Sequence, residues 1–168
     1  EPPPSCWNRS GHGSIDVSEA LGVSCNYFFY EMGYRLGKNL RGNYDNSLGL
    51  KKIKEYATMF GLADKSGVEV SETEPQVSDE DAVRSAIGQG TNAYTPVQLA
   101  RYVTAIANDG DCYNLTLLKR IKDSRGGVVK ENKASLYGTV RLKSSTWELI
   151  HDGMYQVVYG EDTSVGPL

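Results

Sequence analysis

The chain has 168 residues, of which 39% are hydrophobic, enough for one domain with a core of its own. Its net charge of −3 and isoelectric point near 5.4 argue against a nucleic-acid-binding surface. No apolar run approaches the roughly 20 residues that a membrane-spanning helix requires, and no secretory leader pattern is present.

Capping residues and hydrophobic spacing predict three helices near the start of the chain, over residues 16–22, 26–37 and 47–60. Asp16 followed by Glu19 is a capping-box pattern, in which each side chain bonds a backbone N–H of the other residue. The second helix places Phe28, Met32 and Leu36 on one stripe.

The middle of the chain is expected to be a loop followed by a well-marked helix. Residues 64–81 are rich in acidic side chains and predict a solvated loop, with a short extended piece at Val68–Val70. Ala86-Ile87-Gly88-Gln89-Gly90 predicts a glycine-framed turn. A helix then begins at Pro96, with Thr95 and Gln98 as its capping box. Its expected buried face is Leu99, Tyr102, Val103 and Ile106.

The last part of the chain predicts an antiparallel hairpin and one more helix. The hairpin strands are expected over 115–122 and 128–130, with a turn over 123–127. Ser145 and Glu148 form a further capping-box pattern at the start of the final helix. The apolar side of that helix is Trp147, Ile150, Met154, Val157 and Val158.

Ser24-Cys25-Asn26 lies at the predicted corner between the first two helices. A hydroxyl and an amide two residues apart can relay a proton and bind a peptide, which makes Ser24 and Asn26 candidate site residues. The structural alternative is that Ser24 or Asn26 caps the second helix, as both residue types favour that position. Spacing alone favours the cap.

The cysteines Cys6, Cys25 and Cys112 lack the close spacing of a metal site, and no metal is predicted. A Cys6–Cys112 or Cys6–Cys25 disulfide is possible, but the sequence selects neither, and free thiols are expected. His12, between two glycines, is expected to belong to a turn. No cofactor motif is present.

Several of these segments, in this order, resemble a known family. The resemblance is carried by Gly11-His12-Gly13, Ser24-Cys25-Asn26, Phe60-Gly61-Leu62, Gly67-Val68-Glu69-Val70, Ala86-Ile87-Gly88-Gln89-Gly90, Thr95-Pro96-Val97-Gln98-Leu99-Ala100 and Ile106-Ala107-Asn108-Asp109-Gly110. The succession is similar to the transpeptidase domain of class B penicillin-binding proteins, most of all the elongation type. It covers residues 6–110 strongly and extends more loosely to about 163.

The resemblance implies an α/β penicillin-binding-protein/β-lactamase-like fold, with residues 1–168 forming a mostly helical part of that domain plus a small antiparallel hairpin. It implies a serine D,D-transpeptidase without a cofactor, which uses Ser-x-x-Lys, Ser-x-Asn and Lys-Thr-Gly motifs. Ser24 would relay a proton between the lysine and the leaving group. Asn26 would bind the peptide amide of the substrate, and Gly88-Gln89-Gly90 would shape a turn under the site.

The family further implies partners and a location. The substrate would be a peptidoglycan stem peptide ending in D-alanyl-D-alanine, and β-lactams would acylate the enzyme. The parent protein would lie on the outer face of the cytoplasmic membrane, anchored by an N-terminal helix and paired with a membrane glycan polymerase.

Two of the three motifs are missing from the chain. No serine is followed by a lysine three residues later, so the nucleophile is expected outside the segment. Lys65-Ser66-Gly67 imitates the third motif, but in the family that motif follows the last helix, so Lys65 is not expected to be catalytic. The abrupt Glu1-Pro2-Pro3-Pro4 start agrees with a cut piece, expected to be inactive alone and to self-associate.

The sequence is also compatible with two other interpretations. A noncatalytic module on the same scaffold would bind cell-wall peptide or a partner protein and would also lack the two motifs. A β-lactam-sensing receptor or β-lactamase of the same superfamily is a further possibility. Asn26 and the Gly88-Gln89-Gly90 stretch favour the penicillin-binding proteins over that last class.

Overall fold

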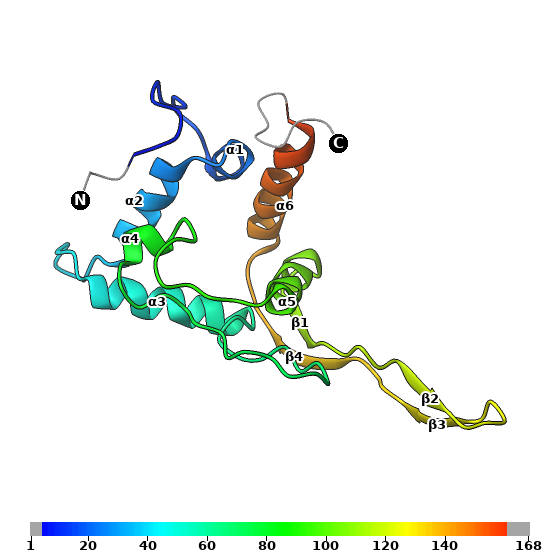
Figure 1. Ribbon diagram of the computed structural model, residues 1–168. Helices are drawn as coiled ribbons and strands as arrows, with labels where there is room; N and C mark the ends of the chain where they lie inside the picture. The colour runs from blue at the N-terminus through cyan, green and yellow to red at the C-terminus, as the bar shows by residue number, and fades with distance from the viewer. Residues whose placement is uncertain (1–4, 161–168) are drawn as a thin grey trace. The chain divides into compact units, whose positions relative to one another are not determined.

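The computed structural model describes residues 5–160, in which six helices and four strands follow one another along the chain (Figure 1). These residues form two compact units. The first combines residues 5–53, 78–91 and 142–160, and the second combines residues 54–77 and 92–141. No helix within the described range is long and apolar enough to cross a membrane.

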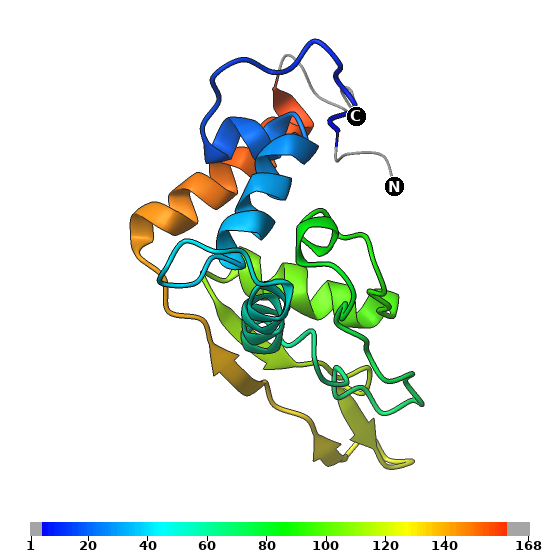
Figure 2. The same ribbon diagram turned by 90° about the vertical axis from the view of Figure 1, so that its left-hand side faces the viewer.

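The first unit is helical. It contains α1 (Val17–Gly22), α2 (Asn26–Leu36), α4 (Ala82–Ser85), α6 (Ser144–Tyr159) and the first half of α3 (Asn46–Met59). Helix α1 lies beside α6 in both views (Figures 1 and 2). The Ser18 hydroxyl donates to the Leu149 carbonyl at 2.8 Å. A Cβ added to Gly153 would lie 2.7 Å from the Leu21 Cβ, so glycine permits this close approach.

The second unit packs one helix beside short antiparallel strands. It contains α5 (Pro96–Ala107), β1 (Asp111–Asn114), β2 (Arg120–Lys122), β3 (Val128–Glu131) and β4 (Ser135–Thr139). Strand β1 pairs with β4, and β2 pairs with β3, each in an antiparallel register with one irregularity. Ala105, Ile106, Cys112 and Val140 are buried and form the apolar part of its core.

Two predicted capping boxes are confirmed. At α1, the Glu19 N–H donates to Asp16 Oδ1 at 3.0 Å, and the Asp16 N–H donates to Glu19 Oε2 at 2.9 Å. At α5, Thr95 and Gln98 exchange the equivalent bonds, with Pro96 at the first helical position. Helices α2 and α3 also begin and end within one residue of their predicted bounds.

The predicted buried face of α5 is confirmed at Ile106 but wrong at Leu99 and Val103. Leu99 and Val103 are 43% and 46% exposed, whereas Gln98 and Arg101 are almost fully buried. The Gln98 side chain is held inside because its amide donates to the Thr73 carbonyl at 2.9 Å. A hydrophobic pattern cannot reveal polar residues that are buried through hydrogen bonds to distant backbone.

Three other local predictions are also wrong. Val68–Val70 is not a strand, since residues 69 and 70 form a bend. Helix α6 begins at Ser144 with Lys143 as its N-cap, so Ser145 lies inside the helix and makes no capping bond. The first hairpin strand covers only 120–122 of the predicted 115–122. The β1–β4 pair was not predicted, because two short strands more than twenty residues apart give no local signal.

Candidate functional site

Ser24 lies at the corner between α1 and α2 in a left-handed backbone conformation. Its φ is +49°, which costs a non-glycine residue about 1–3 kcal/mol. The Ser24 N–H donates to the Leu21 carbonyl at 3.1 Å, and the Cys25 N–H donates to the Ala20 carbonyl at 2.9 Å. These two bonds close the end of α1 and lead the chain directly into α2.

Neither Ser24 nor Asn26 caps α2, so the structural alternative for these two residues is wrong. The N-cap is Cys25, whose side chain makes no capping hydrogen bond, and Asn26 is the first helical residue. Ser24 is exposed and Asn26 is partly exposed. Among residues 5–160, no partner bonds the Ser24 hydroxyl or the Asn26 side-chain amide. Both groups are therefore available to a ligand.

Trp7 holds the corner from a loop that precedes α1. Its indole N–H lies 3.2 Å from the Val23 carbonyl oxygen and 3.1 Å from that of Ser24. Val23 is the C-cap of α1, so the shared bond satisfies carbonyl groups that the helix end leaves without partners. Sequence reasoning missed this contact, because nothing local links Trp7 to residues sixteen and seventeen positions later.

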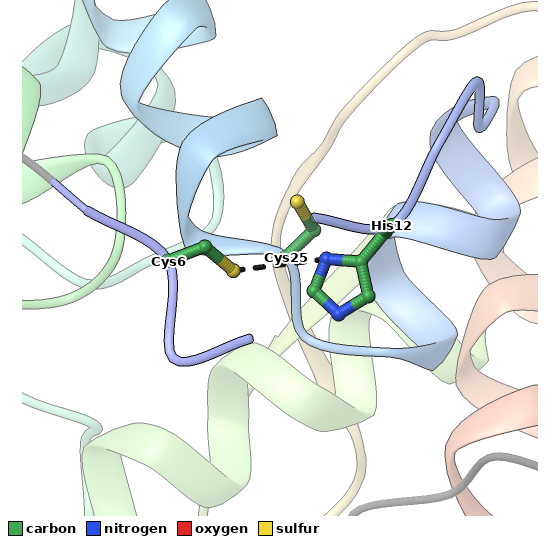
Figure 3. A group of neighbouring side chains, drawn as sticks. All are labelled: Cys6, His12 and Cys25. Atoms are coloured by element: carbon green, nitrogen blue, oxygen red, sulfur yellow. Dashed lines mark hydrogen bonds between the residues drawn. The ribbon is translucent and has the colours of Figure 1, made fainter. Parts of the chain in front are cut away.

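Cys6, His12 and Cys25 come together beside the same corner (Figure 3). The Cys6 sulfur lies 3.7 Å from His12 Nδ1, and all three donor atoms lie within 4.8 Å of one another. The three cysteines are free thiols, as expected. The cluster contradicts the expectation from residue spacing, because Cys6, His12 and Cys25 come together only through the path of the loop, which leaves no signal in the sequence.

The donor set of this cluster fits Zn²⁺. Two thiolates and one imidazole are ligands that zinc favours, and tetrahedral geometry places such atoms roughly 3.3–3.8 Å apart. The observed Cys6–His12 separation of 3.7 Å lies in that range. His12 Nε2 is buried without a hydrogen-bond partner within residues 5–160. A metal held here would have three protein ligands from the described part of the chain and an open fourth position.

The two thiols of the cluster differ in acidity. Burial opposes ionisation of Cys6, but bonds from the backbone N–H groups of Asn8, Tyr27 and Asn26 and from the Cys25 thiol together outweigh it, and the pKa of Cys6 is lowered. Burial and the neighbouring Cys6 raise the pKa of Cys25. Cys6 therefore becomes a thiolate more readily than Cys25.

A pocket of about 770 Å³ opens next to the cluster. Its walls come from the loop over residues 5–15 and from Cys25, Tyr27 and Phe28 at the start of α2. Neither Ser24 nor Asn26 lines this pocket. It therefore lies beside the Ser24–Asn26 corner and gives access to the thiols.

Lys65 and Ser66 are engaged in bonds within their own unit. The Lys65 ammonium pairs with Glu74 at 2.5 Å, and the Lys65 carbonyl accepts a bond from Arg101. Ser66 is fully buried and its hydroxyl donates to Glu72 at 2.8 Å. Neither residue lies on a strand. These contacts give both residues a structural role and agree with the expectation that Lys65-Ser66-Gly67 is not a substrate-binding motif.

The predicted glycine-framed turn is confirmed after α4. Gly88 and Gly90 both have positive φ, at +79° and +87°. A Cβ at Gly90 would lie 2.5 Å from the Ser78 hydroxyl oxygen, which also accepts a bond from Ser85 at 2.7 Å. The turn is therefore fixed by close packing on a buried serine pair.

Residues 2–165 match the family described as penicillin binding protein transpeptidase domain. The Haemophilus influenzae protein named peptidoglycan D,D-transpeptidase MrdA is 26% identical over 170 residues, which cover 90% of this chain and 24% of that protein. Penicillin-binding protein 2B from Streptococcus pneumoniae strain R6 is similar in structure, with a TM-score of 0.79 and 25% identity over 96% of this chain and 29% of that chain.

A third match, to penicillin-binding protein A from M. tuberculosis, has a TM-score of 0.71 at 19% identity over 94% of this chain and 34% of that one, and shows the shared fold. The chain spans about a quarter of the length of the curated relatives that it matches, as the coverage of 24% for the Haemophilus influenzae protein illustrates.

Proposed function

The chain belongs to the penicillin-binding-protein transpeptidase domain family, and on that premise we propose that it supplies the Ser-x-Asn corner of a serine D,D-transpeptidase that cross-links peptidoglycan. The proposal rests on the exposure of the Ser24 and Asn26 side chains and on their lack of hydrogen-bond partners in the described range. Both polar side chains lie at one exposed corner, and neither bonds another residue in the described range. A hydroxyl and an amide without partners in the protein can form hydrogen bonds to a substrate, and the hydroxyl can also pass on a proton.

In the proposed reaction, a nucleophilic serine outside this segment loses its proton to a lysine and bonds the D-alanyl carbonyl carbon. The terminal peptide bond then breaks, and the departing D-alanine takes a proton relayed through the Ser24 hydroxyl. Asn26 holds the substrate backbone, because its amide both donates and accepts hydrogen bonds. An amine from a second stem peptide then bonds the acyl carbon, the ester bond to the nucleophilic serine breaks, and a proton from the amine returns to the serine oxygen. β-Lactams would enter at the same carbonyl-binding position and remain attached as acyl-enzymes.

The isolated segment lacks one group that the proposed reaction requires. Without a Ser-x-x-Lys motif, the 168-residue chain has no nucleophile of the family type and is proposed to be inactive alone. Intact mass after incubation with excess benzylpenicillin tests this directly. No added mass is expected, whereas a stoichiometric adduct on a serine would overturn the proposal.

The role of Ser24 and Asn26 is tested in the complete gene product that contains this segment. We expect Ser24→Ala to slow acylation by benzylpenicillin by about 10²–10⁴-fold, the usual contribution of a proton-transfer group. Asn26→Ala should weaken noncovalent binding before acylation. Wild-type rates in both variants would show that Ser24 and Asn26 take no part in acylation and would overturn the proposal. A complete gene product that binds a D-alanyl-D-alanine peptide but is not acylated would instead support the noncatalytic module.

Self-association of the isolated segment forms part of the same proposal. Leu99 and Val103 on α5, together with Val128 and Val129 on β3, leave apolar surface exposed in this chain. Exposed apolar faces of this kind are buried by association or by another part of the protein. Size-exclusion chromatography should show species larger than a monomer, and a strictly monomeric chain at all concentrations would contradict this.

The partner and the location follow from family membership. We propose that the parent acts on the outer face of the bacterial cytoplasmic membrane, beside a membrane enzyme that polymerises glycan strands. Co-purification of the complete gene product with such a polymerase from membranes tests the pairing. Recovery of the complete gene product in a soluble cytoplasmic fraction would argue against the location.

A further inference from the structure

The indole of Trp7 bonds two consecutive carbonyl groups at the Ser24 corner. Its N–H lies 3.2 Å from the Val23 oxygen and 3.1 Å from the Ser24 oxygen. An indole N–H is a donor only, so the contact has one polarity and requires both carbonyls to point toward the ring. This arrangement fixes the direction of two peptide planes at once.

The loop that carries Trp7 is held by hydrogen bonds between its own residues. Within it, the Asn8 side-chain amide donates to the Gly11 carbonyl at 3.0 Å, and the Ser10 N–H donates to the Asn8 side chain at 3.0 Å. The Trp7 ring also packs edge-on against His12, with centroids 5.2 Å apart and planes at 62°. Trp7 is therefore held in place although 59% of its surface is exposed.

The Ser24 backbone needs such support. Its left-handed conformation, with φ at +49°, is one that serine leaves readily unless neighbouring groups hold it. The Val23 and Ser24 carbonyls belong to the two planar peptide groups on either side of the Ser24 Cα, so holding both carbonyls restrains the backbone rotation of Ser24, φ and ψ. That rotation sets where the Ser24 hydroxyl stands relative to Asn26 at the start of α2.

We propose that Trp7 is a positioning residue for the Ser24–Asn26 site, which holds the Ser24 backbone, and with it the hydroxyl, through its indole N–H. This inference rests on the proposed function of Ser24. In this role Trp7 acts through the Ser24 backbone and not through contact with the reacting atoms. Its contribution is to keep the proton-relay hydroxyl in one place, so it acts on the rate of acylation more than on the binding of the β-lactam.

The test uses the complete gene product with Trp7 replaced by benzothienylalanine, in which sulfur takes the place of the indole N–H and the ring size is kept. Acylation by benzylpenicillin is resolved into a noncovalent dissociation constant and an acylation rate constant. Loss of one hydrogen bond should lower the acylation rate constant by about two- to tenfold, with the dissociation constant and Tm nearly unchanged. Trp7→Phe should show the same loss.

Tyr56→Phe is the matched control, because it also removes one polar group from an exposed aromatic ring, on α3. An unchanged acylation rate constant with benzothienylalanine at position 7 overturns the inference. Equal loss of binding, rate and Tm also overturns it, since that pattern marks a general structural brace.

Ser24→Ala separates this inference from the proposed function. If Ser24→Ala slows acylation while both Trp7 variants do not, only the positioning role fails. If Ser24→Ala has no effect, the proposed function fails and the positioning role fails with it. In the 168-residue chain, backbone coupling constants at Ser24 give an independent measure, and an unchanged left-handed φ after Trp7→Phe counts against the inference.

Discussion

The Arg101 guanidinium lies over the Tyr137 ring, 4.8 Å from its centre, inside the second unit. Arg101 is 1% exposed and donates to the carbonyls of Lys65 at 2.8 Å and Asp64 at 2.7 Å, and also to that of Gly61. The Tyr137 hydroxyl bonds the Asp64 carboxylate at 2.5 Å, and this bond raises the pKa of Tyr137 to about 12. One buried cation thus organises the loop after α3.

Arg101→Met should destabilise the chain strongly, although methionine suits a buried position. The change leaves three carbonyl groups without their charged donor, and the expected loss in free energy of unfolding is about 2–4 kcal/mol. Urea denaturation measures it. Arg141→Met, at an exposed position, is the control and should change stability little. Equal midpoints for the two variants would show that the guanidinium contributes little.

Glu69 links the loop before α4 to the base of the β2–β3 hairpin. Its carboxylate accepts bonds from the Thr116 hydroxyl, from the Leu117 N–H at 2.9 Å and from Asn132 at 3.1 Å. The Thr116 bond first, then that of Leu117, lowers the pKa of Glu69 to about 2, from an ordinary 4.5. A lowered pKa means that the stabilising contribution is complete above about 4.5 and is lost as the pH falls toward 2.

Glu69→Gln should therefore make the rate at which the hairpin base opens independent of pH in the acid range. Hydrogen exchange of the Leu117 amide, followed from pH 5 to about 2, should show faster opening in wild type at the acid end and a flat profile in the variant. Glu148→Gln, on the exposed side of α6, is the control and should keep the wild-type profile. Loss of the step in the control would assign it to another carboxyl group.

Much of the helical frame could be predicted from the sequence, because its signals are local. The capping boxes at Asp16 and Thr95 place both partners three residues apart, and Pro96 marks the start of α5. The position of Ser24 and Asn26 at an inter-helix corner was predicted for the same reason. What these residues do was not predictable from spacing, which favoured a cap that Cys25 occupies instead.

The contacts that surround the corner could not be predicted, because their partners lie far apart in the chain. Trp7 reaches the Ser24 carbonyl across seventeen residues, and Cys6 meets Cys25 through the path of the same loop. The buried state of Arg101 is also a tertiary effect, since it depends on three carbonyls that converge from the loop after α3. Patterns in a single sequence do not predict tertiary contacts of this kind.

Gly33→Ala should destabilise the contact between α2 and α4. A Cβ at this position would lie 2.7 Å from the Ala82 carbonyl oxygen and 2.9 Å from the Val83 Cα, both on the backbone. The helix-forming gain of alanine over glycine, up to about 1 kcal/mol, is outweighed because backbone atoms cannot move aside easily. The expected net loss is about 1–3 kcal/mol in free energy of unfolding, measured by urea denaturation.

Gly138→Ala is the matched control for that substitution. It adds the same methyl group in β4, where nothing lies within 4 Å. Its effect should stay within about 0.5 kcal/mol. If Gly33→Ala were no more destabilising than Gly138→Ala, the two helices would have to separate at no cost, contrary to their close packing.

Zinc should bind the cluster of Cys6, His12 and Cys25 and raise the Tm of the reduced chain. Binding to the folded state alone stabilises it, and a tenfold excess of metal over Kd adds about 1.4 kcal/mol. Differential scanning fluorimetry with ZnCl₂, followed by removal of the metal with a chelator, measures the effect in both directions. Cobalt in place of zinc should give thiolate-to-metal absorption, which reports the cysteine ligands directly.

Cys112→Ser provides the control for zinc binding, because Cys112 is a buried thiol in the other unit and should not affect the metal. Cys6→Ser and His12→Ala should each abolish the Tm increase, since either change leaves only two donors. Oxidation that joins Cys6 to Cys25 should abolish it as well, and reduction should restore it. An equal Tm increase in wild type and Cys6→Ser would place the zinc elsewhere and contradict the assignment of these ligands.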